Sequence, residues 1–316
     1  MAYKAVYYIC TDPSFGPVAH RVWQALQELG VLQEKTGIFC DGEEVMQYTD
    51  ENGNRFSFVP AKQAICLDYP RYLPLMNEHF SDYNVAGMVT WHEGASAPPH
   101  IFTVHSLGDV NQGVYGPASP QHMHNLLAAM QREKEALKLD DYSVVPEATH
   151  WSGMTEDNDD ATLLLQYPVP MMDIEIGSET ESWEDPRAIT VLAKALLQVF
   201  QEDGLQLHNL LCVGGVHFDP AFAQAVHTVW ENQTFGVTHI LANQWLVAGE
   251  YENEDGFERA KNAIDAIDGG ICAIAFHDKM KGHYKDLVRA LGKEYDVPIF
   301  KHQRLRKPET MELPDA

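Results

Sequence analysis

Histidine and glutamate side chains recur in this sequence where short, apolar, strand-like runs end. The sequence of 316 residues holds fifteen histidines, and several of them stand at such ends beside Glu, Gly or Ser. The side chains that we single out for acid–base or metal chemistry are His92, His105, Glu147, His150, Glu175, His217 and His239. A neutral histidine can act as a general base near pH 7, and histidine and glutamate are both zinc ligands.

The spacing of these residues leaves their role open. No two of the histidines stand at the H-E-x-x-H spacing that places zinc ligands on one face of a helix. A single histidine at a strand end is more often a hydrogen-bonded structural residue than a catalyst. Gly214 and Gly215 follow another strand-like run, and they either hold an oxygen on their backbone N–H groups or form a tight turn.

Strand-like and helical patterns alternate along the chain, which predicts an α/β fold. We expect a mixed, largely parallel sheet with helices on both faces. The expected strands include residues 3–10, 64–67, 85–90, 163–166, 171–176, 210–213, 237–241 and 271–276, and the expected helices include 126–139, 185–200, 220–230, 256–267 and 284–295. Ligands of open α/β sheets bind outside the carboxyl ends of the strands, so five His- or Glu-bearing strand ends are expected to meet in one crevice.

The chain shows no internal repeat and no long linker, so we expect one α/β catalytic unit over residues 1–307. Residues 1–86 could form a smaller N-terminal lobe within it. Residues 308–316 combine two prolines with alternating acids, a composition typical of a disordered tail.

The formal net charge of −24 argues against a general nucleic-acid-binding protein, which is normally basic. Nine basic and only three acidic residues lie between Lys279 and Lys307, however, which gives this stretch a charge of +6. The stretch is either a solvated helix face with a basic tail or a local patch that contacts phosphates. Composition alone does not decide between the two.

The five cysteines are scattered and form no C-x-x-C pair, a pattern typical of free thiols in a reducing compartment. The longest apolar runs have the length of strands, which excludes a membrane span, and no signal peptide is recognisable at the N-terminus. We therefore expect a cytoplasmic protein with no membrane partner, and we favour a monomer.

Several sequence blocks stand in the order and at the spacing of one known family: Thr103–Gly108, Glu147–His150, Ile174–Ser178, Val213–Pro220 and His239–Leu241. The most distinctive pair is Glu-Ala-Thr-His followed about 25 residues later by Glu-Ile-Gly-Ser. With these blocks the chain resembles the archaeal and plant D-aminoacyl-tRNA deacylases over residues 3–303. One departure lies at Ala242-Asn243-Gln244-Trp245, where archaeal relatives carry Pro-Lys-Tyr.

The resemblance implies a phosphorylase- or peptidyl-tRNA hydrolase-like fold, and hydrolysis of the ester between a D-amino acid and the 3′ end of tRNA. The catalytic candidates that follow are His105, Glu147, His150 and His217. The resemblance also implies Zn²⁺, with His92, Glu175 and His239 as ligands together with His105, His150 and His217. The expected contacts with the tRNA end or the reacting ester are Thr103, Gly108, Gly214, Gly215, Lys279 and Lys281.

Two other functions stay open at this point. One is a metal-dependent hydrolase or phosphorylase-like enzyme that acts on a small nucleoside or peptide, since one fold hosts many chemistries. The other is a non-catalytic module that binds the end of tRNA, for which the basic stretch suffices without the histidines.

Overall fold

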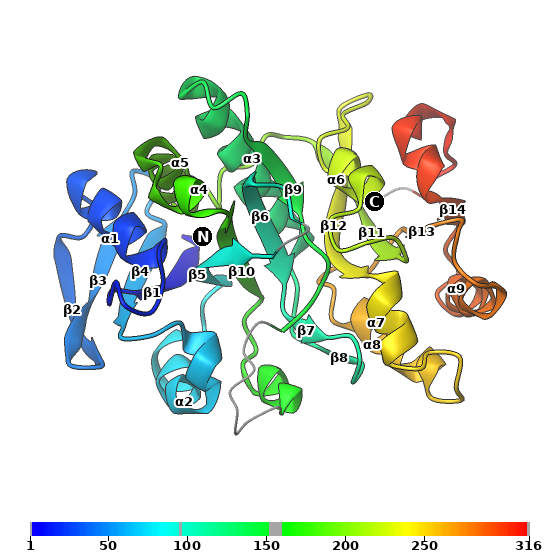
Figure 1. Ribbon diagram of the computed structural model, residues 1–316, viewed down its shortest axis with the longest axis horizontal. Coiled ribbons are helices and arrows are strands. Elements are labelled where there is room, and N and C mark those ends of the chain that lie inside the picture. The colour runs from blue at the N-terminus through cyan, green and yellow to red at the C-terminus, as the bar shows by residue number, and fades with distance from the viewer. Residues whose placement is uncertain (1, 95–96, 152–159, 315–316) are drawn as a thin grey trace.

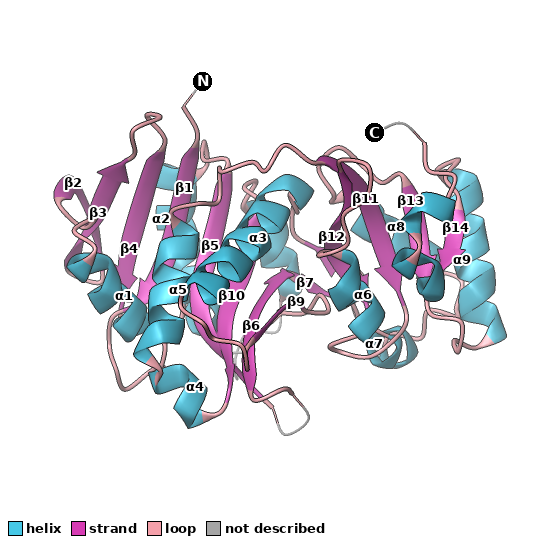
Figure 2. Ribbon diagram, turned by 90° about the horizontal axis from the view of Figure 1, so that it is seen from above, coloured by secondary structure: helices cyan, strands magenta, loops and turns pink. Residues whose placement is uncertain are grey.

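Two β-sheets lie side by side in the protein (Figure 1). The structure is a computed structural model and describes residues 2–94, 97–151 and 160–314. The large sheet has eight strands in the order β2-β3-β4-β1-β5-β10-β6-β9, and the small sheet has four in the order β12-β11-β13-β14. Figure 2 shows the strands of both sheets from above, with β12 facing the large sheet.

The strands of the large sheet are β1 Lys4–Cys10, β2 Glu34–Cys40, β3 Glu43–Thr49, β4 Arg55–Ala61, β5 Val85–Glu93, β6 His100–Ser106, β9 Ser143–Pro146 and β10 Met171–Ser178. Those of the small sheet are β11 Gln206–Val213, β12 Gln233–Leu241, β13 Ala273–Phe276 and β14 Ile299–Lys301. A short hairpin adds β7 Gly108–Asp109 and β8 Val114–Tyr115.

The helices are α1 Ala19–Glu28, α2 Tyr69–Phe80, α3 Pro120–Ala136, α4 Thr180–Glu184, α5 Pro186–Leu196, α6 Pro220–Ala225, α7 Asn243–Ala248, α8 Gly256–Asp265 and α9 Gly282–Glu294. Short 3-10 turns cover Ile65–Asp68, Ala161–Gln166, His302–Arg306 and Pro308–Thr310.

Most strand pairs are parallel, as the sequence predicts. In the large sheet β4, β1, β5 and β10 run parallel, and β6 runs antiparallel to β10 but parallel to β9. All pairs of the small sheet are parallel. The prediction of a mixed, largely parallel α/β fold is therefore confirmed, although the strands divide between two sheets.

Apolar side chains fill both faces of the large sheet. Along β1, Tyr7 packs into the core beneath α1, α3 and α5, whereas Tyr8 packs into the core beneath α2. The two tyrosines point to opposite faces because successive side chains of a strand alternate. The small sheet has α6 on one face, and α8 and α9 on the other. Helices thus cover both faces, as predicted.

Two of the expected strands are wrong. Ile65–Asp68 is a 3-10 turn that leads into α2, where Pro70 suits the first turn of the helix. Ala161–Gln166 is also a 3-10 turn, because the Asp160 carboxylate accepts the N–H of Thr162 and caps it. Both segments are short and apolar, a pattern that does not separate a strand from a buried turn.

The organisation of residues 1–307 as one unit stays a prediction. The strands before residue 87 belong to the same sheet as β5 and β10. Beyond residue 307, Pro308–Thr310 forms a turn, and Met311 and Leu313 pack against the core; residues 315 and 316 lie outside the described part. Among the described residues no helix is long and apolar enough to cross a bilayer.

Candidate active site

Three neighbouring strands of the large sheet turn polar side chains toward one face near their ends. Alternate residues of a strand share a face, and the register of β5, β10 and β6 sets these residues beside one another. They are Thr90 and His92 on β5, Asp173 and Glu175 on β10, and Thr103 and His105 on β6. Four of the six, all but Asp173 and Thr90, were expected from the sequence.

The deepest part of this group is His105 with two carboxylates. His105 Nε2 lies 3.7 Å from an oxygen of Asp173 and 3.7 Å from an oxygen of Glu175. The Thr90 hydroxyl donates to the Asp173 carboxylate and lies 3.3 Å from Glu175. Thr103, opposite Glu175 in the register, is fully buried. This group is closed to solvent, since His105 and Asp173 have no exposed area.

The segment from Glu147 to His150 connects the two sheets and carries the next part of the site. The Glu147 N–H donates to Val104 O of β6, and the Thr149 N–H donates to Ile240 O of β12. Ala148 lies between them and donates to His217 O, just beyond β11. These backbone hydrogen bonds place Glu147, His150 and His217 at the junction of the sheets.

Glu147 lies at the centre of the site and has no exposed area. Its Oε1 accepts a hydrogen bond from His217 Nε2, and lies 3.6 Å from His92 Nε2 and 3.7 Å from His150 Nδ1. The His150 ring also stacks on the His105 ring, with centroids 3.9 Å apart. Glu147 therefore joins the partly exposed histidines to the buried group around His105.

Hydrogen bonds to ring nitrogens orient these imidazoles. His150 Nδ1 is 2.9 Å from Ala148 O, which fixes a proton on Nδ1 and makes Nε2 the basic nitrogen. His92 Nδ1 is 2.9 Å from the Ser178 hydroxyl, so its Nε2 faces Glu147. The side chain of His150 is 22% exposed, enough for a substrate to reach it.

Burial and neighbouring charges shift the pKa values of the site in opposite directions. Burial lowers the pKa of His150 to about 3, and the nearby His105 adds to the shift. Burial, together with the Glu147 and Asp173 carboxylates, raises the pKa of Glu175. Burial alone would raise the pKa of Glu147, but the hydrogen bond from His217 and the adjacent His150 outweigh it and lower this pKa. Groups held so far from their usual pKa values are typical of functional sites.

The donor set of this site fits a metal ion. Three groups of ligand atoms lie close enough together to hold one: His92 with Glu147 and His217, His105 with Glu147 and His150, and His105 with Asp173 and Glu175. Among the described residues, buried Glu147 Oε2, Glu175 Oε2 and His105 Nε2 find no hydrogen-bond partner. Imidazole nitrogens and carboxylate oxygens are the donors that zinc and similar divalent metals bind.

Three further predicted residues have other roles in the structure. His239 belongs to none of these groups: it is fully buried, with Nδ1 3.1 Å from the Thr149 hydroxyl and Nε2 3.3 Å from Gly116 O. The Gly108 N–H donates to His150 O and the Gly214 N–H to Leu241 O. Both amides are therefore engaged within the chain and do not offer donors to an oxyanion.

The glycines after β11 are needed for packing. Gly214 and Gly215 have φ values of 87° and 78°, in the left-handed region that favours glycine. A Cβ atom on Gly214 would lie 2.4 Å from Met280 Sδ, and one on Gly215 would lie 2.3 Å from the Asp219 carboxylate. The tight-turn interpretation of Gly214-Gly215 therefore accounts for both residues.

Lys279 and Lys281 follow the carboxyl end of β13, at the same edge of the small sheet as His217. Phe276 at the end of β13 pairs with Val213 at the end of β11, and both lysines follow β13 closely. Both are exposed, and Lys281 is the N-cap of α9. The structure therefore brings this part of the basic stretch to the edge of the sheet where the site lies.

Two cavities meet at His150. The first, of about 430 Å³, is lined by Gly108, Asp109, Val110, Asn111, Gln112, Thr149, His150, Trp151 and Trp245. The second, of about 310 Å³, is lined by Ala64, Cys66, Leu67, Thr90, Trp91, His92, Glu93, His150, Glu175 and His217. The substrate of any reaction at Glu147 and His150 would occupy these spaces.

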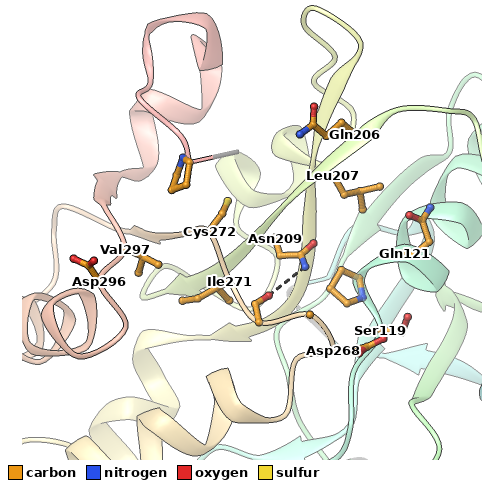
Figure 3. Close-up of a pocket in the computed structure, with 14 residues that line it drawn as sticks. Ser119, Gln121, Gln206, Leu207, Asn209, Asp268, Ile271, Cys272, Asp296 and Val297 are labelled. Atoms are coloured by element: carbon orange, nitrogen blue, oxygen red, sulfur yellow. Dashed lines mark hydrogen bonds between the residues drawn. The ribbon is translucent and has the colours of Figure 1, made fainter. Parts of the chain in front are cut away.

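A larger cavity of about 550 Å³ opens elsewhere (Figure 3). Gln206 and Leu207 at the start of β11 line it, with Asp268 and Cys272 before β13. It lies at the amino ends of these strands and contains none of the predicted site residues. Size alone does not mark the active site, so we place it at the carboxyl ends, where the histidines and carboxylates meet.

Asp173, Thr90 and Trp245 belong to the site but were not among the predicted residues. A signal existed for Asp173, which stands two residues before Glu175 in one strand and so must share its face. Trp245 lies against His150 and His217, with ring centroids 5.6 and 5.2 Å apart. It carried no local signal, because helix α7 was not expected.

Comparison with known proteins agrees with the sequence blocks that resemble the D-aminoacyl-tRNA deacylases. The family model of the D-aminoacyl-tRNA deacylases matches residues 79–300. The chain belongs to the D-aminoacyl-tRNA deacylase family. The family resemblance inferred from the sequence is thus confirmed.

Individual members of the D-aminoacyl-tRNA deacylase family match parts of the chain. The deacylase of Haloarcula marismortui is 29% identical over 227 residues, 67% of this chain and 45% of that protein. The deacylase of Sulfurisphaera tokodaii is 26% identical over 61% of this chain and 77% of its own length. The chain therefore spans about half the length of the Haloarcula marismortui protein. A crystal structure of a conserved protein of unknown function shares the fold, with a TM-score of 0.71, 19% identity and 97% of both chains covered.

Proposed function

We propose that this protein hydrolyses the ester bond of D-aminoacyl-tRNA and releases the free D-amino acid and tRNA. The observation that carries the proposal is the position of Glu147, which three histidines surround at the junction of two cavities. Membership of the deacylase family supports the same reaction. An ester hydrolase needs an activated water and a way to hold both sides of the ester; His150 and the two cavities beside it are the candidates for these two tasks.

In the proposed mechanism His150 is the general base. Its Nε2 takes a proton from the attacking water while the water oxygen bonds to the ester carbonyl carbon. The bond from that carbon to the ribose oxygen then breaks, and the proton on Nε2 passes to the ribose oxygen. Stacking on His105 and the hydrogen bond to Ala148 O hold the His150 ring in place.

We propose Zn²⁺ as the metal, held by His92, Glu147 and His217, the most exposed of the three groups at this site. When bound, zinc supplies a Lewis acid beside the ester. Metal analysis of the purified protein by mass spectrometry tests this assignment. His92→Ala with His217→Ala should lose most of the bound zinc, whereas His20→Ala, on helix α1, should keep it. Equal zinc in all three proteins would contradict the ligand set.

Deacylation of matched D- and L-tyrosyl-tRNA tests the proposed function. Release of D-tyrosine at a rate far above that of L-tyrosine supports it, and equal or absent turnover of both excludes it. Two alternatives have their own signatures. Turnover of a free nucleoside or peptide would favour a small-substrate hydrolase, and tight tRNA binding without turnover would favour a binding module.

We also propose that the enzyme works in the cytoplasm, where aminoacyl-tRNA is found. All five cysteines are free thiols, and four of them are buried, which suits a reducing compartment.

A further inference from the structure

We infer that the two cavities at His150 divide the substrate between them, with the terminal adenosine of tRNA against Trp245 and the D-amino acid side chain against Leu67 and Trp91. This inference rests on the proposed deacylase function. It adds the residues that hold each half of the ester, and therefore those that decide which substrates are accepted.

The position of His150 carries the first step. An aminoacyl-adenosine has a nucleoside on one side of the ester carbonyl and an amino acid on the other. Of the described residues, His150 is the one that lines both cavities. A carbonyl carbon that receives water activated at His150 therefore has one cavity on each side, and each half of the substrate enters a different one.

The chemistry of the first cavity suits an adenosine. Trp245 and Trp151 supply aromatic surface, and each base has a face that stacks on aromatic rings. Trp151 is held edge-on by Tyr69, with centroids 5.2 Å apart. The Asp109 and Asn111 side chains add polar groups that can meet the base edge or the ribose hydroxyls. At about 430 Å³ the cavity has room for a nucleoside.

The surroundings of this cavity also suit the rest of the tRNA. Trp245 lies on α7, and the Tyr284 hydroxyl of α9 reaches Leu246 O of α7 at 3.5 Å. Helix α9 begins directly after Lys281. The exposed Lys279 and Lys281, just before α9, are therefore the basic residues that we assign to the phosphates before the terminal adenosine.

The second cavity has the character of an amino acid side-chain pocket. Ala64, Cys66, Leu67 and Trp91 form an apolar wall, and the exposed Glu93 adds a carboxylate that can receive an α-ammonium group. It is the smaller space, at about 310 Å³.

Binding of adenosine 5′-monophosphate, measured by titration calorimetry, tests the assignment without any need for turnover. The wild-type protein should bind AMP. Trp245→Ala should weaken the Kd about ten-fold or more, the effect expected for loss of one stacked base. Trp245→Phe should keep most of the affinity, and Gln244→Ala, at the exposed neighbouring position, should keep all of it. Thermal unfolding shows whether each variant is folded.

A second set of measurements tests the other cavity. Leu67→Ala should lower kcat/KM for D-tyrosyl-tRNA several-fold relative to D-alanyl-tRNA, while AMP binds as before. No AMP binding by the wild type, or equal binding by wild type and Trp245→Ala, overturns the inference. AMP binding that depends on Leu67 and not on Trp245 also overturns it, because the two halves would then be exchanged.

The outcome for this inference is separate from that for the proposed function. If the wild type deacylates D-tyrosyl-tRNA but its AMP binding does not depend on Trp245, the proposed function is supported and the cavity assignment is wrong. If AMP binding depends on Trp245 but no deacylation occurs, the adenosine site is supported and the proposed enzymatic function is wrong.

Discussion

Loss of His150 should lower the rate strongly and the stability little. Its side chain is partly exposed, and the buried Glu147 carboxylate keeps His92 and His217 beside it after truncation. If Nε2 accepts the proton of the attacking water, His150→Ala should lower kcat about 100-fold or more. Steady-state deacylation of D-tyrosyl-tRNA measures this effect, and thermal unfolding serves as the control. Unchanged kcat in a folded variant would assign His150 a structural role only.

His105 should behave in the opposite way, because it is buried between two carboxylates. Its removal leaves Asp173 and Glu175 without their cationic partner in a site closed to water. Breaking a buried pair of this kind costs about 3–5 kcal/mol. His105→Ala should therefore lower the free energy of unfolding in urea by about that amount. A loss below about 1 kcal/mol would show that the carboxylates adapt without His105.

His239 makes stability depend on pH. Burial lowers the pKa of His239 to about 4, from 6.5 in the unfolded chain, so the unfolded state binds the extra proton between these values. Stability is then fully present above pH 6.5 and falls as the pH falls toward 4. From pH 7.5 to pH 5 this residue should account for a loss of about 2 kcal/mol.

The comparison that isolates this effect is urea unfolding of the wild type and His239→Asn at both pH values. The variant should be less stable at pH 7.5, since it loses contacts with Thr149 and Gly116, yet its further loss at pH 5 should be smaller. A parallel pH dependence in both proteins would contradict the burial of a neutral His239.

At the scale of elements, the segment Glu147–His150 fixes the position of one sheet relative to the other through its hydrogen bonds to β6 and β12. The Thr149 hydroxyl accepts the N–H of Ile240 on β12 and contacts His239. Thr149→Val keeps the shape but leaves that N–H without its acceptor, which costs about 1–3 kcal/mol. Thr149→Ser keeps the hydroxyl and is the matched control.

This segment also carries Glu147 and His150, so Thr149→Val should lower kcat as well as the free energy of unfolding. Urea unfolding and deacylation kinetics of the Val and Ser variants measure both effects. Equal behaviour of the two variants would show that the hydroxyl does not hold the segment.

The sequence allowed most strands to be predicted, but not their arrangement. Strands β1, β5 and β10 are rich in β-branched and aromatic residues, which local patterns reveal. That β10 lies between β5 and β6 depends on contacts far apart in the chain, for which no local pattern exists. The division into two sheets is invisible for the same reason.

The site residues were predictable to a similar extent. Glu147, His150 and His217 were selected as candidates, and the structure brings them together. His239 was selected as well, yet it lies within strand β12, and its partner Thr149 is 90 positions away. Sequence context therefore selects residue types and strand ends, whereas long-range packing decides which of them share a site.

At the scale of the whole molecule, the proposed function requires a chain of net charge −24 to attract a polyanion. If Lys279 and Lys281 contact phosphates, Lys279→Ala with Lys281→Ala should raise KM for D-tyrosyl-tRNA, and each lost contact should flatten the salt dependence by about one unit of slope. A charge-matched control is Lys35→Ala with Arg55→Ala, on β2 and β4 away from the site. Equal salt slopes in the two double variants would mean that only net charge matters.

Glu147 lies at the centre of the proposed active site, so the most direct measurement is the single-turnover rate of D-tyrosyl-tRNA deacylation by Glu147→Gln. The variant keeps the shape of the side chain but removes the charge that His92, His150 and His217 surround. We predict a rate at least about 100-fold below that of the wild type, in a protein whose unfolding remains cooperative. A folded Glu147→Gln variant that deacylates D-tyrosyl-tRNA within about two-fold of the wild-type rate would contradict this account.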